Sequence, residues 1–405
     1  MTNNLPLADV KILDLMWAMA GPAATRMLAD YGATVVRVES TRRFDATRTV
    51  GPFHNGQPGP ESSGLFYNMN TGKHLLTLDL AKEAGRAVIL DLVRWADVMA
   101  EAFSPKAMRA WGFDYESLRK VKPDLIMLST CLMGQTGPLA QFAGFGNLAA
   151  ALSGFANLAG WPDRPPAGPF GAYTDYIAPW FNAATVLAAL EYRRRTGQGQ
   201  YIDLSQAEAA LHFLGPALLD YTVNGRAQSR TGNRDPNYAP HGVYPAAGTD
   251  QWIAIAVTNN EQWQALCAAM ARPELLNDER FATPTARLAH ADELDAQVAV
   301  WTKDQDPVHA ESALQARSVP ANAVRTLHEL YTDPQLVHRG HFVDLEHPTH
   351  GKTTVEGSRF QLSRTPARIA GSAPTLGRDN QYVLATLLGY NEERITELAA
   401  AGVLE

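Results

Sequence analysis

The pattern of apolar and polar positions in the first forty residues predicts a strand, a helix and a second strand. The apolar run 10–17 (VKILDLMW) is typical of a buried strand, and 34–40 (TVVRVES) repeats that pattern after the amphipathic segment 20–33. Pro22 suits the first turn of this helix, and Gly32 ends it. Such a unit is expected in a parallel sheet. Because no G-x-G-x-x-G follows the first strand, a dinucleotide-dependent oxidoreductase is disfavoured.

The alternation continues along the chain. A helix and strand are predicted within 84–103, and another strand followed by a glycine-containing loop within 123–142. A further helical run follows residue 206 and extends to about residue 225. The segment 230–257 is rich in turn residues and ends in a strand, which indicates the start of a second, smaller domain.

The stretch 171–206 holds the clearest helix and one isolated acid. Its helix is rich in alanine and leucine and ends in three arginines before Gly197, as helix propensity and the helix dipole favour. Proline is tolerated only in the first turn of a helix. We therefore expect the helix to start at Ala178 or Pro179, which leaves Asp175 in the preceding loop.

Asp175 has two interpretations from the local sequence. An aspartate just before a helix is most often a cap, since free N–H groups and the dipole stabilise its ionised form. The other interpretation is a catalytic carboxylate. The eleven histidines show no spacing typical of metal ligands, so we expect no metal site.

Composition narrows the range of functions. The chain has 405 residues, of which 46% are hydrophobic, and a net charge of −7, and it has no basic block of the kind that binds nucleic acid. Cys131 and Cys267 lie far apart and indicate neither a disulfide framework nor zinc. The uncharged stretch 138–162 holds too little Leu, Ile and Val for a membrane span, and we interpret it as buried helix and loop. The N-terminus lacks a signal-peptide pattern, so we expect a cytoplasmic protein.

Several motifs in order resemble the family III CoA-transferases, which include formyl-CoA:oxalate and carnitine CoA-transferases and have the alpha-methylacyl-CoA racemases as relatives. The N-terminal strand leads into A-G-P, the loop 123–142 is close to S-x-x-G-x-G-Q-T-G-P, and the helix after Asp175 ends in RRRTGQGQ. The resemblance covers essentially the whole chain. It implies that Asp175, which precedes R-x-T-G-x-G-Q, is the nucleophile.

The resemblance also implies an α/β fold and a domain organisation. We expect a Rossmann-like large domain with a parallel sheet and a smaller α+β domain. The N-terminal part of the large domain would be 1–225, the small domain 226–330, and the return to the large domain 331–405. Family members form interlocked dimers, so a homodimer, or a heterodimer with a related subunit, is expected.

CoA would be a substrate, with no permanently bound cofactor and no nucleic-acid or membrane partner. The residues implied to bind CoA are Arg42, Arg43, Arg48, Lys73, Phe103 and Arg109. The sequence departs from the family pattern at Phe44, Gly72, His74 and Ala102. In addition, Arg109 stands one position before the arginine of the family pattern. Arginine suits CoA phosphates because its planar fork makes charge-assisted hydrogen bonds.

The reaction implied is transfer of CoA from an acyl-CoA to a carboxylic acid through aspartyl anhydride and aspartyl-CoA thioester intermediates on Asp175. Two alternatives stay open: an acyl-CoA racemase, disfavoured because Phe145 replaces the histidine of the racemases, and a non-catalytic partner subunit. Met19, Phe145 and Trp180 either pack the core or line an acceptor pocket. In the second case the acceptor has an apolar or aromatic body, as in enzymes of the succinyl-CoA:benzylsuccinate kind, with succinyl-CoA as donor.

Overall fold

The computed structural model describes residues 5–405, and they form two compact units. The first comprises residues up to 156 together with 168–227 and 335–405, and the second comprises 157–167 and 228–334. The segment 157–167, placed by the sequence analysis in the large domain, therefore groups with the second unit.

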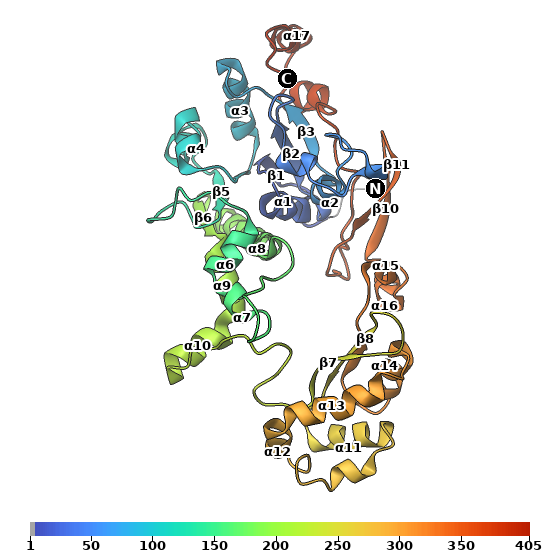
Figure 1. Cartoon of the computed structure of the whole chain (residues 1–405). Coiled ribbons are helices and arrows are strands. Elements are labelled where there is room, and N and C mark those ends of the chain that lie inside the picture. The colour runs from blue at the N-terminus through green and yellow to red at the C-terminus, as the bar shows by residue number, and fades with distance from the viewer. Residues whose placement is uncertain (1–4) are drawn as a thin grey trace. The chain divides into compact units, whose positions relative to one another are not determined.

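A six-stranded parallel sheet forms the centre of the first unit, with strand order β3-β2-β1-β4-β5-β6 (Figure 1). Its strands are β1 (Lys11–Leu15), β2 (Thr34–Glu39), β3 (His74–Thr77), β4 (Val98–Glu101), β5 (Ile126–Cys131) and β6 (Tyr201–Ser205). The order reverses between β1 and β4, and such a switch point leaves a crevice at the carboxyl ends of the strands. The mixed α/β fold with a parallel sheet, expected above, is confirmed.

Both faces of this sheet are covered, because successive strand side chains point to opposite sides. Leu13 of β1 packs in a core with α3 (Glu83–Trp95), whereas its neighbour Ile12 packs in a second core with α1 (Ala20–Asp30) and α8 (Tyr173–Thr196). The remaining helices of this unit are α2 (Gly64–Asn70), α4 (Pro105–Trp111), α5 (Tyr115–Val121), α6 (Gly146–Leu152), α9 (Gln206–Leu211), α10 (Gly215–Asn224) and α17 (Glu392–Ala400), with the π-helical η5 (Tyr382–Leu387) and the short 3₁₀ helices η1 (Ala46–Thr49), η2 (His54–Gly56) and η3 (His212–Leu214). An antiparallel hairpin, β10 (Phe342–His347) and β11 (Gly351–Glu356), completes it.

The second unit combines an antiparallel sheet with helices. Its sheet has the order β7-β8-β9, formed by β7 (His241–Pro245), β8 (Trp252–Ala256) and β9 (Ala321–Ala323). Its helices are α11 (Asn260–Ala269), η4 (Pro273–Leu276), α12 (Pro284–Ala289), α13 (Ala291–Thr302), α14 (Pro307–Gln315) and α15 (Leu327–Leu330). Two short helices, α7 (Phe155–Leu158) and α16 (Pro334–His338), cross the boundaries between the units.

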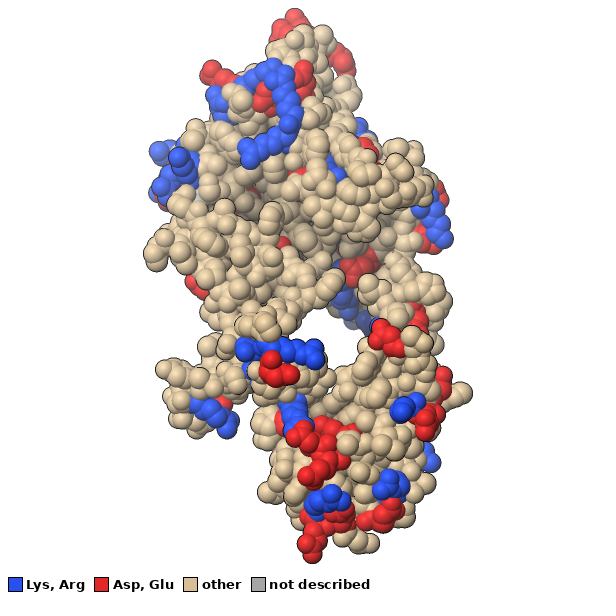
Figure 2. All heavy atoms as spheres, in the orientation of Figure 1, with Lys and Arg blue, Asp and Glu red and all other residues tan. Residues whose placement is uncertain are grey.

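The surface shows two further features. Acidic and basic side chains are interspersed on the face drawn in Figure 2. The stretch 138–162 was interpreted from the sequence as buried helix and loop, but it is not uniformly buried, since Phe145 is 60% exposed and Leu152 is 53% exposed. Within residues 5–405, no helix combines the length and apolar character needed to cross a membrane.

Candidate active site

Asp175 lies in the first turn of α8, and its side chain is buried, with only 6% of the residue exposed. The helix begins at Tyr173 and includes Pro179, so the expectation of a start at Ala178 or Pro179 is wrong. Pro179 cannot donate to the carbonyl of Asp175, four residues earlier. Because α8 packs against α1 and α6, the helix tolerates this one missing hydrogen bond.

The start of α6 holds the Asp175 carboxylate through the backbone. The N–H of Gly146 donates to Asp175 Oδ2 at 3.4 Å, and Thr174 Oγ1 donates to the Gly146 carbonyl at 3.1 Å. A Cβ at position 146 would lie 2.8 Å from Asp175 Cγ and equally close to the Ala172 carbonyl oxygen. Only glycine therefore allows α6 to approach the carboxylate this closely.

Burial dominates the electrostatics of this carboxyl. Removal from water raises the pKa of Asp175 to about 6, and the Gly146 N–H lowers it only in part. A carboxylate that is ionised near neutral pH yet poorly solvated is well suited to act as a nucleophile.

Asp175 faces a cavity of about 240 Å³ at the carboxyl ends of β1, β4 and β5. Met19 and Phe145 line this cavity, as expected above, whereas Trp180 is absent from its lining. Trp180 stands five positions after Asp175, a rotation of about 140° around the helix, and its ring lies 6.4 Å from that of Phe360. Asp175 is the only charged residue lining the cavity within the described chain.

A second cavity, of about 540 Å³, adjoins the first at the ends of β1, β2 and β4. The two share the lining residues Trp17, Ala102, Phe103 and Ser104. The Phe103 ring packs edge-on against Trp17, with 5.5 Å between their centroids. An elongated ligand bound in the second cavity could thus reach Asp175 in the first.

Glu101 fixes the backbone of this shared wall. Its Oε2 accepts a hydrogen bond from the N–H of Phe103 at 2.7 Å, and only 1% of the residue is exposed. Burial raises the pKa of Glu101 to about 7. The protonation state of Glu101 therefore affects the hydrogen bond that holds the backbone of Phe103 in place.

Arg42 and Arg43 supply positive charge at the second cavity. Arg42 is largely exposed and forms ion pairs with Glu405 and, at 3.8 Å, with Asp79. The Arg43 guanidinium lies 6.0 Å from the centre of the Trp17 ring and makes no ion pair with residues 5–405. Arg43 is therefore available to an anionic group.

The other cations implied to bind CoA lie elsewhere. Arg48 is fully buried, donates to Glu39 Oε2 at 2.9 Å and to Glu61, and lies 3.6 Å from the centre of the Phe66 ring. Lys73 is also buried and donates to Asp14 Oδ2 at 3.0 Å and to Asn70. Arg109 is exposed on α4 and lines neither cavity. For these three residues, CoA binding stays a prediction to which the geometry adds no support.

Four residues that line the two cavities were not singled out from the sequence, namely Trp17, Trp111, Thr130 and Gln206, and neither was Gly146, which donates to Asp175. One signal was available for Gln206, because it directly follows the strand QYIDLS and carboxyl ends of parallel strands meet at one edge of the sheet. Gly146 gave no such signal, since its role depends on the approach of a distant helix.

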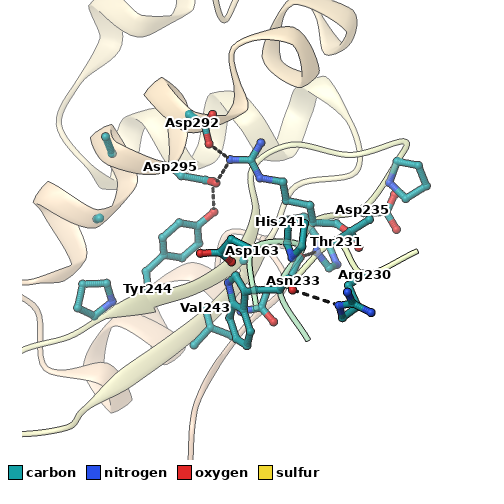
Figure 3. Close-up of a pocket in the computed structure, with 18 residues that line it drawn as sticks. Asp163, Arg230, Thr231, Asn233, Asp235, His241, Val243, Tyr244, Asp292 and Asp295 are labelled. Atoms are coloured by element: carbon teal, nitrogen blue, oxygen red, sulfur yellow. Dashed lines mark hydrogen bonds and ion pairs between the residues drawn. The ribbon is translucent and has the colours of Figure 1, made fainter. Parts of the chain in front are cut away.

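The second unit holds a larger cavity, of about 880 Å³, drawn in Figure 3. There Arg234 points between Asp292 and Asp295, and the Tyr244 hydroxyl donates to Asp295 at 2.7 Å (Figure 3). Its carboxylates outnumber its arginines, and within residues 5–405 no group of three or more His, Cys, Asp or Glu side chains could hold a metal ion. The cavity is larger than that of Asp175, but its Asp292 and Asp295 carboxylates are paired with Arg234.

Comparison with known proteins finds CoA-transferases among the relatives of this chain. A succinyl-CoA–D-citramalate CoA-transferase from Chloroflexus aurantiacus is 34% identical over 98% of this chain and 98% of its own. A succinate–glutarate CoA-transferase from Agrobacterium fabrum is 36% identical over 94% of this chain and 96% of its own.

A solved structure, that of a CAIB/BAIF family protein from Brucella suis, superposes with a TM-score of 0.87 at 32% identity and covers 95% of this chain and 100% of that one. The family model of the CoA-transferase family III matches residues 7–380. The chain therefore belongs to CoA-transferase family III.

Proposed function

We propose that this CoA-transferase moves CoA from succinyl-CoA to a carboxylic acid with an apolar or aromatic body, with Asp175 as the nucleophile. The observation that carries the proposal is the buried carboxylate of Asp175 in a small cavity that shares a wall with a larger, arginine-lined one. CoA would lie in the larger cavity, where Arg42 and Arg43 face its phosphates and Phe103 and Trp17 border its thioester end.

The reaction would proceed by two exchanges at the Asp175 carboxyl. An Asp175 oxygen bonds to the thioester carbonyl carbon, the C–S bond breaks, and CoA leaves as a thiolate. The thiolate then attacks the aspartyl carbonyl of the anhydride, which releases the donor acid and leaves an aspartyl-CoA thioester. The acceptor carboxylate reverses these steps, and no proton needs to be transferred. Exclusion of water from so small a cavity would protect the anhydride.

Two observations bear on the substrates. One relative is named for succinyl-CoA and the other for succinate, which supports succinyl-CoA as the donor. Within residues 5–405 the Asp175 cavity has no cation in its lining but has apolar side chains at Met19 and Phe145, which favours an acceptor with a hydrocarbon body over a very small dianion such as oxalate. Trp180, 40% exposed on α8, would contribute only to the outer part of such a site.

The covalent step is tested by intact-protein mass. Incubation with succinyl-CoA should add CoA to the parent chain, and hydroxylamine should convert the adduct to a hydroxamate at Asp175. Asp175→Asn should show neither product and should lose several orders of magnitude in kcat with the fold intact. An adduct on another residue, or an active Asp175→Asn variant, would refute the assignment.

The acceptor is tested with a panel of acids at fixed succinyl-CoA, and the donor with acetyl-CoA as the matched thioester. Specificity constants should favour aryl- or alkyl-substituted acids over oxalate and glutarate, and Met19→Gln should reduce that preference. An enzyme fastest with glutarate, or with acetyl-CoA in place of succinyl-CoA, would contradict this part of the proposal.

A further inference from the structure

Two buried polar side chains beside Asp175 have no hydrogen-bond partner. Gln206, the first residue of α9, is 8% exposed, and its Oε1 has no partner within the described chain. Thr130 is 0% exposed, and its Oγ1 has none either. An unpaired buried polar group costs on the order of 1–3 kcal/mol, so native proteins rarely keep one without a reason.

Both side chains line the small cavity that holds Asp175. The sheet register explains their proximity: Thr130 of β5 pairs with Leu204 of β6, and Gln206 follows two residues later at the same end of the sheet. The helix α8, which begins beside Asp175, packs against both β5 and α9. A nucleophile and two unpaired polar groups therefore border a space of about 240 Å³.

We infer that Gln206 and Thr130 are catalytic residues that donate hydrogen bonds to the carbonyl oxygen of the acyl group reacting at Asp175. The inference rests on the proposed nucleophilic role of Asp175. When the Asp175 oxygen bonds to the carbonyl carbon, that carbonyl oxygen becomes an oxyanion, and it returns to a carbonyl as the C–S bond breaks. The amide and the hydroxyl keep their protons throughout and stabilise the negative charge.

Neutral hydrogen-bond donors are important for stabilising an oxyanion in this cavity, because no cation lines it within the described chain. Hydrogen bonds to an ionised group are about twice as strong as those between neutral groups. The Thr130 hydroxyl has no partner within the described chain and need break no existing hydrogen bond to bind the oxyanion, whereas the unpartnered atom of Gln206 is its acceptor Oε1. A side-chain amide can present its nitrogen by rotation, since its oxygen and nitrogen ends have nearly the same shape.

The test compares Gln206→Met and Thr130→Val with the parent enzyme. Each substitution removes a donor while nearly keeping side-chain size. We expect kcat with succinyl-CoA to fall about 100- to 1,000-fold for each variant, with KM changed by less than about threefold. The Tm should stay equal or rise, because an unpaired buried polar group has been removed. A purely structural role predicts the opposite pattern, a lower Tm with little change in kcat.

Gln135→Met is the matched control. Gln135 is also a glutamine, 9% exposed, with an unpartnered Nε2, but it does not line the Asp175 cavity. Its substitution should keep kcat within about twofold of the parent. An equal loss in Gln135→Met and Gln206→Met would overturn the inference, because the loss would then come from the fold.

The outcomes also separate this inference from the proposed function. If Asp175→Asn is inactive while Gln206→Met and Thr130→Val keep kcat within twofold, the donors are excluded and the nucleophile stands. If Asp175→Asn remains active, the nucleophile assignment fails and the inference fails with it.

Discussion

The carboxyl of Asp175 sits where ionisation is unfavourable, yet the proposed reaction needs its ionised form. Burial raises the pKa of Asp175 to about 6, and among the described residues no cation in the cavity lining opposes that rise. At neutral pH most molecules would carry the carboxylate at a cost to stability. This combination predicts one effect of pH on activity and another on folding.

Activity should rise with pH through the pKa of Asp175. The protonated carboxyl is not a nucleophile, so kcat/KM for succinyl-CoA should increase up to about pH 6 and then level off. Initial rates from pH 4.5 to 8.5 measure this limb. Glu101→Gln is the control, because burial also raises the pKa of Glu101, to about 7. A limb that persists in Glu101→Gln belongs to Asp175, whereas its disappearance would assign it to Glu101.

Removing the charge of Asp175 should stabilise the fold above pH 6. The folded pKa, about 6, exceeds the ordinary value of 3.8, so the folded state binds more protons between these values and the free energy of unfolding falls as pH rises through this window. Above it the ionised group costs up to about 3 kcal/mol. Asp175→Asn should therefore be more stable than the parent by up to that amount at pH 8, with little difference near pH 4.

Denaturant unfolding at pH 4 and pH 8 provides the measurement. Asp304→Asn, at an exposed position, should change the free energy of unfolding by less than about 0.5 kcal/mol at either pH. A parent chain that is more stable than Asp175→Asn at pH 8 would mean that the carboxylate is well paired in the folded state.

At the scale of elements, the starts of α6 and α8 are held together at Gly146. Gly146→Ala places a Cβ 2.8 Å from Asp175 Cγ, and the nearby backbone of Ala172 and Asp175 leaves no room for it to move away. We expect the carboxylate to shift and kcat to fall on the order of 100-fold, because a displacement of about 1 Å can cost that much. The free energy of unfolding should also fall by about 1–3 kcal/mol.

Steady-state kinetics and denaturant unfolding of Gly146→Ala test this prediction. The control is Gly168→Ala, where an added Cβ meets nothing within 4 Å and φ is not positive. Equal activity of the two variants would show that α6 does not position the nucleophile.

Local patterns predicted the elements well wherever periodicity and turn residues agree. The expected strand at 10–17, helix at 20–33 and strand at 34–40 correspond to β1, α1 and β2. The predicted start of α8 was wrong because the prediction considered only the hydrogen bond that Pro179 cannot make. Packing of the whole helix against its neighbours outweighs that one lost bond.

The candidate site was predictable only in part. Motif order pointed to Asp175, and two of the three expected pocket residues, Met19 and Phe145, line its cavity. Motif matching does not show which cationic side chains are buried in ion pairs within the protein. Arg48 and Lys73 are two such side chains. Motif matching also does not show the approach of Gly146 to Asp175, because that contact joins two helices through an intervening loop.

At the scale of the whole molecule, apolar side chains remain exposed on three helices of the first unit. On α10, Leu219 and Tyr221 are each 62% exposed and Val223 is 75% exposed, while α6 and α8 expose Leu152 and Leu187. Exposed apolar surface of this extent is typical of subunit contacts. This supports the proposal that the chain forms a dimer, with the interlocked arrangement expected from the family resemblance.

The dimer prediction has a sharp test because interlocked chains cannot separate without unfolding. Sedimentation of the chain expressed alone should give about twice its mass of 44.1 kDa, unchanged on dilution to nanomolar concentration. Tagged and untagged dimers mixed under native conditions should not exchange subunits over days, but should form mixed dimers after unfolding and refolding together. Leu219→Asp with Val223→Asp should reduce dimer yield, since two charges would be buried without partners. A folded 44.1 kDa monomer would exclude the homodimer and favour a related partner chain, and rapid exchange would exclude interlocking while leaving an ordinary dimer.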